Sequence, residues 1–521
     1  MAKSKVITKD RVLIDEVQES PVDRHELRFR RIIVWGFLGI VILVVVWLAW
    51  RFSSDRPLTF KTAEEHFKYG SIGAEVGGSV FNPIGGILPP YWIFKILPDI
   101  CPDKLPGGYA SLGLIFEKGQ DVPIGVTRRH RLGFEQAGLN CAGCHTGTYR
   151  ASPQSEPQIV LGMPAHGLEL QGFFAFVNAC MLDPRFTPDN VIGRIQAAGG
   201  NLGLLDRFLF RTQVIPRARE TALVLNSRVA ALLNENAARW GAGRVDTFNP
   251  YKAIQFNWRL EALPPSELIG ASDYPSLWNQ KPREGMHLHW DGNNDSVDER
   301  NLSASLGAGV TPVTIDHEGL KRVRDWIWTL PPPPYPFKID QALAARGGRL
   351  YRDQCAGCHA DHRFREGVVE KDGYVGQVVP IGKIGTDPFR LNSYTLAFAS
   401  NQYSLYPASE YRFKRFRKTN GYANQPLDGI WARAPYLHNG SVPTLRDLLE
   451  PPQSRPKVFY RGYDVFDPAR VGFRHDVAEE KGRRYFRFDT SLPGNGNGGH
   501  EYGTRLSDAD KKAIVEYMKK F

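Results

Sequence analysis

Two short segments of this chain combine two cysteines with a histidine at a fixed spacing. Each reads Cys-x-x-Cys-His, at residues 141–145 and 355–359. Two thiols three residues apart share one helical turn, where each can bond a vinyl group of a porphyrin while the adjacent imidazole binds the iron. The spacing therefore predicts two covalently bound haem c groups with His145 and His359 as axial iron ligands. The attachment thiols are Cys141, Cys144, Cys355 and Cys358.

Zinc is the competing interpretation of paired Cys-x-x-Cys hooks. Structural zinc sites usually have a short stretch between the two pairs. Here the pairs lie far apart, and each is followed directly by the histidine that haem attachment needs. Leu350, Tyr351 and Gln354 also lead into the second signature as a short helix would. The sequence favours haem.

A long apolar run precedes both signatures. Residues 32–50 contain no charge and no proline, and these 19 residues, at about 1.5 Å each, just span a hydrocarbon core about 30 Å thick. A cleaved signal peptide needs a shorter apolar stretch and a small-residue cleavage site. Because this run follows a 31-residue tail and ends in Trp47 and Trp50, we expect an uncleaved transmembrane helix at 32–50 after a cytoplasmic tail at 1–31.

The charges around the apolar run predict its orientation. Eight Lys or Arg residues precede the run, and Arg28, Arg30 and Arg31 directly abut it, whereas fewer follow. The positive-inside rule leaves the tail in the cytoplasm. The resemblance of the haem signatures to bacterial c-type cytochromes implies maturation outside the cytoplasmic membrane. We therefore expect a single-pass protein of the bacterial inner membrane with its haem domains in the periplasm.

Composition narrows the class of protein. Hydrophobic residues make up 42% and charged residues 23% of the 521 residues, which is ordinary for a globular chain. The net charge of +11 could attract an acidic redox partner or anionic lipid, but a dispersed basic surface with neither role is equally common. No nucleic-acid module accompanies the charge, so we expect no nucleic-acid partner.

Two cysteines, Cys101 and Cys180, lie outside the haem signatures. In an oxidising compartment two spare thiols can pair. Two buried free thiols are the alternative, and the sequence leaves both open.

Prolines mark the clearest internal boundary. The proline-rich segment 331–336, with four consecutive prolines at 331–334, forbids a helix and favours an extended linker. Before the linker, residues 316–328 have the apolar spacing of a helix. At the C-terminus, Ser507 and Asp510 predict the capped start of another helix. Each half thus has a haem signature towards its beginning and a helix at its end, as in cytochrome c modules.

We therefore expect a mainly α fold with two tandem cytochrome c-like haem domains and long irregular loops, preceded by one transmembrane helix. The first domain is predicted at 51–330, with an insertion that contains a helical stretch over 204–238. The second domain is predicted at 337–521. Strand signals are few and short.

Longer segments carry a family resemblance. MHLHWDGNNDSVDERN at 286–301 and APYLHNGSVPTLRDLL at 434–449 resemble the bacterial dihaem cytochrome c peroxidase superfamily. FKYGSIGAE, GLNCAGCHTG, PSLWNQ, GRVDTFNPYK and GHEYGT are more similar to the branch that includes the dihaem rubber oxygenases. The similarity covers roughly residues 60–521. It implies that the first haem is the reaction site and that the second delivers or stores electrons.

The resemblance also bears on the axial ligands. His145 and His359 correspond to the proximal ligands, and peroxidases of this superfamily often use a distal Met on the second iron. This chain has no Met between Met286 and Met518. His500 matches the distal-His position of the rubber-oxygenase branch, so we expect a bis-His second haem that is more reducing than a His/Met haem.

Trp290 aligns with the tryptophan that lies between the two haems in the peroxidases and couples them electronically. We expect it to take part in catalysis together with the haem on His145, although a buried core Trp is the simpler interpretation. Trp278 is a weaker candidate for the same relay.

Other histidines receive no firm role. The resemblance places His438 near the second haem, as a packing residue rather than a ligand. His287 and His289 precede Trp290 and could line the inter-haem region or cap a loop. His130 and His166 flank the first signature in sequence, and either is a candidate distal acid or base, although a structural role is favoured for both.

The sequence thus predicts a membrane-anchored periplasmic dihaem oxidoreductase that activates peroxide or dioxygen at the first haem. Oxidation of an organic substrate is slightly favoured over peroxide reduction, because the specific motifs resemble the oxygenase branch and the peroxidase Met is absent. The expected partners are a periplasmic electron donor or acceptor, peroxide or dioxygen, and an organic substrate. A calcium ion between the domains, as in some relatives, is a further possibility. The alternatives are a non-catalytic membrane-tethered electron-transfer cytochrome c and a maturation enzyme that oxidises residues of a partner protein.

Overall fold

The computed structural model describes residues 21–521 except 57, 76–87, 132, 234–237 and 368–373. Contacts divide the chain into two compact units, with the boundary between Ser54 and Asp55. The last residue of the predicted helical stretch at 204–238 is described, but 234–237 lie outside the described residues.

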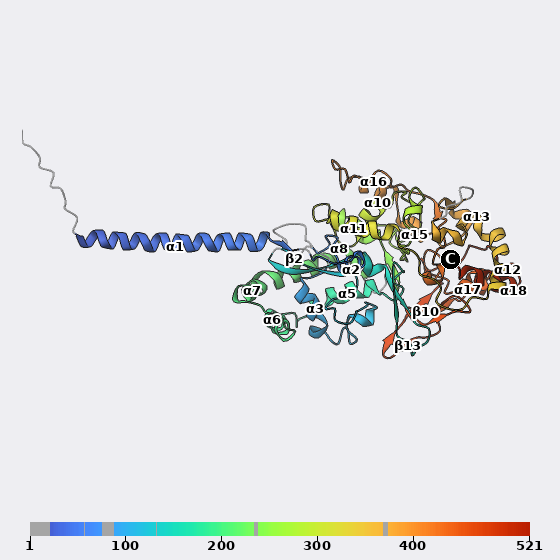
Figure 1. The fold of residues 1–521 in the computed structure, drawn as a ribbon, viewed down its shortest axis with the longest axis horizontal. Helices are drawn as coiled ribbons and strands as arrows, with labels where there is room; N and C mark the ends of the chain where they lie inside the picture. Colours follow the sequence, from blue (N-terminus) through green and yellow to red (C-terminus); the bar gives the residue numbers. More distant parts are fainter. Residues whose placement is uncertain (1–20, 57, 76–87, 132, 234–237, 368–373) are drawn as a thin grey trace, which may run out of the picture. The chain divides into compact units, whose positions relative to one another are not determined.

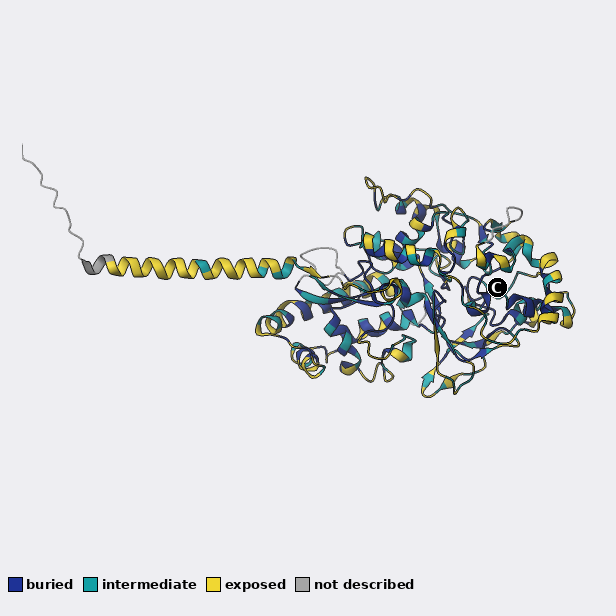
Figure 2. Ribbon diagram, in the orientation of Figure 1, coloured by how far each residue is buried: buried dark blue, intermediate teal, exposed yellow. Residues whose placement is uncertain are grey.

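The apolar run forms one long helix in the first unit. Helix α1 spans Pro21–Ser53, so it is longer at both ends than the predicted 32–50. Its segment His25–Ser53 is long and apolar enough to cross a membrane and is exposed along its length (Figures 1 and 2). An N-terminal signal sequence would satisfy the same criteria of length and composition. The helix is therefore a candidate anchor or a candidate signal.

Helices dominate the second unit, Asp55–Phe521, as the sequence predicts (Figure 1). The α-helices before residue 330 are α2 (Ala63–Tyr69), α3 (Tyr91–Ile100), α4 (Cys141–Cys144), α5 (Leu170–Met181), α6 (Pro188–Ala197), α7 (Leu204–Leu209), α8 (Ile215–Leu233), α9 (Asn249–Gln255), α10 (Val297–Gly307) and α11 (His317–Trp328). Those after it are α12 (Gln341–Tyr351), α13 (Gly357–His359), α14 (Ile381–Ile384), α15 (Phe389–Ser393), α16 (Leu396–Gln402), α17 (Leu445–Leu448) and α18 (Asp508–Met518).

Shorter helical turns connect several of these helices. Two are π-helical: η2 (Phe210–Val214) joins α7 to α8, and η5 (Arg352–Ala356) joins α12 to α13. The 3₁₀ turns are η1 (Tyr109–Leu112), η3 (Leu260–Ala262), η4 (Lys281–Arg283), η6 (His362–Glu366), η7 (Ile430–Arg433) and η8 (Pro452–Ser454).

The strands are short, also as predicted. The three-stranded antiparallel sheet has the order β1 (Asp55–Arg56), β2 (Val126–Arg131), β3 (Phe134–Leu139). The other sheets are two-stranded and antiparallel: β4 (Thr146–Tyr149) with β5 (Gln158–Leu161), β6 (Arg244–Asp246) with β7 (Ala271–Asp273), β8 (Val378–Pro380) with β9 (Gly421–Ala423), β10 (Val458–Arg461) with β15 (Phe486–Asp489), β11 (Phe466–Asp467) with β12 (Gly472–Phe473), and β13 (Glu479–Glu480) with β14 (Arg483–Arg484).

Helix caps explain where several helices begin. The side chain of Asp316 accepts a hydrogen bond from Gly319 N at the start of α11, and Ser507 accepts one from Asp510 N at the start of α18. Each cap satisfies a backbone donor that the first helical turn leaves without a partner. Both predicted helices, at 316–328 and at the C-terminus, are confirmed.

The two halves of the second unit share hydrophobic cores. One core packs Met163 and Trp278 from the first half against Tyr351 and Trp431 from the second. The proline-rich segment 331–336 runs along this core, where Pro333 O accepts a hydrogen bond from Trp431 Nε1 at 3.1 Å. Contacts do not separate the halves, and two distinct cytochrome domains remain a prediction from the sequence.

Candidate haem sites and the link between them

The first haem signature sits on a single capped turn. Asn140 Oδ1 accepts a hydrogen bond from Ala142 N at 3.0 Å and so starts α4, which contains Cys141 and Cys144. Gly125, at φ +92°, brings its backbone against the turn, and a Cβ there would lie 2.1 Å from Gly143 Cα. Only glycine permits this close approach. The turn thus presents both thiols, which are free of disulfides, from a rigid backbone.

His145 is oriented as an iron ligand would be. Its Nδ1 donates a hydrogen bond to Pro275 O at 2.8 Å, so Nε2 keeps a free lone pair. Burial lowers the pKa of His145 to about 4, while the hydrogen bond to Pro275 opposes the shift. The imidazole is therefore neutral at physiological pH. These residues fit a covalently attached haem.

The second signature repeats this arrangement. The turn η5, which continues α12, carries Cys355, and α13 carries Cys358 and His359. His359 Nδ1 donates to Gln425 O at 2.8 Å, which again leaves Nε2 as the free nitrogen. Burial lowers the pKa of His359.

His500 faces His359 from the opposite side. Their ring centroids lie 6.1 Å apart, and two imidazoles on opposite sides of one metal ion, with metal–nitrogen distances of about 2 Å, place their centroids about 6 Å apart. His500 Nδ1 is buried without a hydrogen-bond partner among the described residues. Burial lowers the pKa of His500 to about 3, so this ring is also neutral. The pair fits a haem iron held by two imidazoles.

Arg455 holds the turn that presents His500. His500 has φ +50°, a conformation that costs energy for a residue with a side chain. Arg455 is 2% exposed, and its guanidinium directs its N–H donors to backbone carbonyls. The acceptors are Glu450 O, Asn497 O, Gly499 O, Leu448 O and His500 O, at 2.5 to 3.3 Å. An arginine has five N–H donors, so the donor capacity is filled, and three of the five bonds fix residues 497–500.

Trp290 connects the segments behind the two signature histidines. Its Nε1 donates to Asp273 O at 2.8 Å, two residues before the Pro275 carbonyl that receives His145. Its own carbonyl accepts from Ala423 N at 2.8 Å, two residues before the Gln425 carbonyl that receives His359. Hydrogen bonds and short stretches of backbone therefore run without interruption from one signature histidine to the other.

Trp278 occupies a different environment. It is fully buried in a hydrophobic core, and its Nε1 donates to Leu161 O at 2.9 Å. Gly162, the next residue, donates its N–H to His145 O. Trp278 thus supports the first signature by packing.

Charged side chains surround Asp273, whose carbonyl accepts the hydrogen bond from Trp290 in the link between the two signature histidines. Its carboxylate accepts from Arg461 Nη2 at 2.8 Å. Burial raises the pKa of Asp273 to about 6, while Arg461 and Arg244 oppose the shift. The region near Trp290 therefore contains two buried guanidinium groups beside one carboxyl group.

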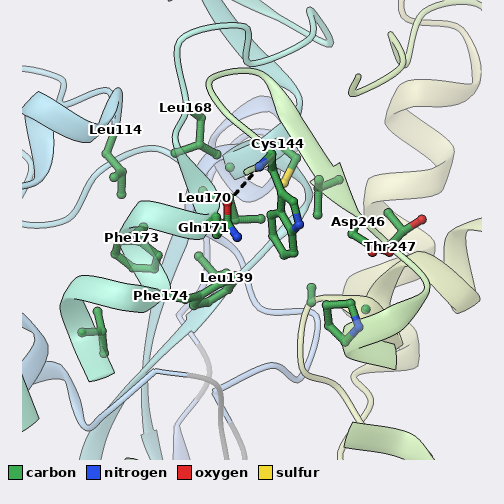
Figure 3. A pocket seen from close by; sticks show the side chains of 18 of the residues that line it. Leu114, Leu139, Cys144, Leu168, Leu170, Gln171, Phe173, Phe174, Asp246 and Thr247 are labelled. Carbon is green, nitrogen blue, oxygen red and sulfur yellow. Dashed lines mark hydrogen bonds between the residues drawn. The ribbon is translucent and has the colours of Figure 1, made fainter. Parts of the chain in front are cut away.

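An apolar cavity of about 210 Å³ adjoins the first signature. Figure 3 shows the sulfur of Cys144 among the leucine and phenylalanine side chains of its wall. Helices α5 and α8 contribute Leu170, Phe173, Val177, Leu225, Val229 and Leu232. No histidine belongs to the lining among the described residues. The lining carboxylate of Asp246 already accepts from Phe248 N, Asn249 N and Asn249 Nδ2.

The histidines suggested as distal groups lie elsewhere. His166 is buried and stacks on Phe473 with ring centroids 3.9 Å apart. His130 belongs to β2, opposite Glu135 in β3. Neither residue is part of the cavity lining. The structure therefore does not bring these two predicted candidates to the cavity beside Cys144.

The remaining histidines pack around the link. His438 stacks on Tyr422, with centroids 4.0 Å apart, and its carbonyl accepts from Asp273 N. His287 Nδ1 contacts Gly292 O at 3.0 Å, and its carbonyl accepts from Gln425 Nε2. These contacts place the His438 and His287 segments beside the inter-signature link.

His289 also belongs to this region. Its Nδ1 lies 2.6 Å from Asn293 Oδ1, and its φ is +61°. Burial lowers the pKa of His289 to about 4. It is a neutral, internally hydrogen-bonded residue.

Cys101 and Cys180 form a disulfide, with Cα atoms 5.9 Å apart. The bond ties the end of α3 to α5 within the first half.

Clusters of metal-binding side chains bear on the expected calcium ion. In the described parts of the chain, no group of three or more His, Cys, Asp or Glu side chains is placed to hold a metal ion. The calcium ion stays an expectation from the resemblance.

Comparison with known proteins supports haem c chemistry at a coarse level. A family model described as RoxA-like, cytochrome c-like matches residues 421–460. This segment contains Ala423 and Gln425, which bond the Trp290 and His359 segments, as well as His438 and Arg455. The chain therefore contains a RoxA-like cytochrome c-like domain, which indicates haem c as cofactor and a haem-dependent oxidoreductase.

Two curated relatives come from Sinorhizobium fredii. The uncharacterized protein y4iJ is 28% identical over 473 residues, which covers 73% of this chain and 76% of the relative. The uncharacterized protein y4iM is 33% identical over 301 residues, which covers 49% of this chain and 66% of that relative. Neither name states an activity.

Proposed function

We propose that this chain is a membrane-anchored periplasmic dihaem c-type oxidoreductase that activates dioxygen or peroxide at the haem of signature 141–145. The haem of signature 355–359 would serve electron transfer. One asymmetry supports this division of labour. His359 faces a second imidazole at 6.1 Å, whereas in the described part of the chain the aromatic ring beside His145 is that of Tyr274, at 6.4 Å.

When bound, a haem with one free coordination position supplies iron that can react with dioxygen or peroxide, whereas a haem held by two imidazoles only exchanges electrons. The chain would hold the first haem through Cys141, Cys144 and His145. Pro275 O orients the His145 ring by accepting its Nδ1 proton. The second haem would be held by the 355–359 signature and His500.

The cavity favours oxidation of an apolar organic substrate over reduction of peroxide. Peroxide cleavage needs an acid–base group near the reacting oxygens. The lining contains no histidine among the described residues, and Asp246 is occupied by three internal donors. The cavity borders Cys144, so the porphyrin attached there would fill part of it. Beside the porphyrin, the aliphatic and aromatic walls would hold an apolar substrate and exclude water.

Trp290 is proposed as the electron relay between the haems. It is hydrogen-bonded on both sides to the segments that orient His145 and His359. An indole placed there would divide one long electron-transfer step between the haems into two shorter steps. A soluble electron donor or acceptor of the periplasm would then exchange electrons with the second haem.

The proposed location rests on three observations. Helix α1 is long and apolar enough to span a membrane, and the basic residues before it favour a cytoplasmic N-terminus. The disulfide between Cys101 and Cys180 suits an oxidising compartment. We propose that α1 is retained as an anchor.

Carbon monoxide binding to the reduced full-length protein tests this proposal. The expected result is one carbon monoxide per chain, at the first haem, because His500 blocks the second. His500→Ala is the matched control and should raise the number to two. Failure of the unaltered protein to bind carbon monoxide would favour the non-catalytic electron-transfer cytochrome c instead.

A further inference from the structure

We propose that α7 lies on the surface of the lipid bilayer and docks the second unit there, with anionic phospholipid as its preferred partner. The inference rests on the membrane anchoring proposed above. It begins with Leu204 and Phe208, which are 88% and 61% exposed. Four residues apart on one helix, they lie on the same face.

Exposed apolar residues alone are common on soluble proteins, so the charge around them matters. Residues 204–233 contain five arginines and two acidic residues. Arg207 and Arg211 flank Phe208, and Arg211 forms an exposed ion pair with Asp189. Large apolar side chains interspersed with arginine are typical of helices that lie in the membrane interface.

The point where the chain leaves α1 is held rigidly on the second unit. Asp55 pairs with Arg131 in the sheet. Its carboxylate also receives a bidentate ion pair from Arg129, with Nε and Nη2 at 2.6 and 2.7 Å. Arg129 is itself largely buried and bonds Asp316 at 3.1 Å. Asp55 is therefore fixed to the folded core.

The junction between α1 and the second unit is short. Helix α1 ends at Ser53 and β1 begins at Asp55, and two residues reach at most about 7 Å. If α1 spans the membrane, the bilayer surface lies close to Asp55. Surface elements of the second unit near Asp55 would then be within reach of lipid headgroups.

Helix α7 is such an element. Arg131, the partner of Asp55, pairs on its other side with Phe134 of β3. The ring of Phe134 contacts that of Phe210, with centroids 5.6 Å apart, and Phe210 directly follows α7. Figure 1 shows α7 and β2 at the same end of the second unit.

Docking through α7 has a consequence for the cavity. Helix α8 continues from α7 through η2 and supplies Leu225, Val229, Leu232 and Leu233 to the cavity wall. In the docked unit, the side of the cavity that α8 forms would lie near the bilayer. An apolar substrate dissolved in the bilayer is thus the class that the arrangement suits.

The test uses the full chain in nanodiscs that each hold one copy, made from equal parts of phosphatidylcholine and phosphatidylglycerol. Leu204→Cys introduces a thiol on α7, and Leu396→Cys introduces a matched thiol on α16, where Leu396 is 70% exposed. A charged maleimide then reports access from water. An unchanged visible haem spectrum verifies the fold of each variant.

The α7 thiol should react about tenfold more slowly than the α16 thiol, because lipid excludes the charged reagent. Adding Phe208→Glu should make the two rates similar. Equal rates without that change would overturn the inference. Protection seen only in vesicles with many copies would assign the surface to a second chain and would also overturn it.

The intact mass of the purified chain separates this inference from the anchoring on which it rests. A chain that has lost residues 1–53 overturns both. A chain that retains them but shows equal labelling rates overturns the docking surface alone.

Discussion

His500 faces His359 with ring centroids 6.1 Å apart and an angle of 43° between the ring planes. One ring follows the second Cys-x-x-Cys pair, and the other comes from a loop about 140 residues later in the chain, held in a left-handed backbone conformation. Burial keeps both rings neutral, so each has a nitrogen lone pair to offer. The relationship distinguishes the second site from the first.

Replacing His500 should open the second haem. In His500→Ala the sixth ligand would be lost, so we expect this haem to become high-spin or to acquire a new ligand. The visible and near-infrared absorption of the purified variant measures this. A spectrum that still reports two imidazoles would show that another residue holds the position.

Arg455 should control the same ligand without touching the haem. Arg455→Gln removes the three hydrogen bonds that Arg455 donates to residues 497–500. Each buried bond contributes about 1 kcal/mol, so without them the turn should no longer keep His500 in its strained backbone conformation. We expect a partial loss of the low-spin bis-His signal. Arg455→Lys should be intermediate.

Arg487→Gln is the matched control for that change. Arg487 is an exposed arginine that pairs with Asp489, so its replacement should leave the spectrum unaltered. A normal bis-His spectrum in Arg455→Gln would remove the positioning role of Arg455.

Trp290→Phe should slow electron transfer between the haems while both remain attached. The change removes the indole and its bond to Asp273 O, and the cost in stability should be about 1 kcal/mol. Flash photolysis of the carbon monoxide-bound, half-reduced protein measures the inter-haem rate.

Trp278→Phe supplies the comparison for the relay. Because Trp278 is a core residue, its replacement should lower the melting temperature. The inter-haem transfer rate should stay close to that of the unaltered protein. Equal transfer rates in Trp290→Phe and the unaltered protein would contradict the relay.

Replacing Cys141 and Cys144 together by Ala should remove one covalent haem and abolish turnover. Without thioether bonds the porphyrin would not be retained by the purified protein. Peroxidase staining of denatured gels and iron analysis should both fall to half. The corresponding change at Cys355 and Cys358 should also halve the iron, and full staining in either variant would contradict the assignment.

Local signals in the sequence predicted much of this account. The two haem signatures, the capped helices α11 and α18 and the apolar helix α1 depend on residues close together in the chain, where spacing and caps determine structure. The extent of α1 was underestimated because its polar N-terminal turns are helical as well.

The groups that orient the predicted ligands were not identified from the sequence. Pro275 lies 130 residues from His145, and Gln425 lies 66 residues from His359. A backbone carbonyl leaves no signature in residue type, so only the folded chain reveals these acceptors. Arg455 could have been noticed only as one arginine among many. The pairing of Cys101 with Cys180 likewise depends on how α3 packs against α5.

The electron paramagnetic resonance spectrum of the oxidised full-length protein tests the central claim most directly, because it counts high-spin and low-spin ferric haem at once. The account predicts equal amounts of each: high-spin iron on His145 and low-spin iron between His359 and His500. Two low-spin signals, or less than two irons per chain, would contradict it.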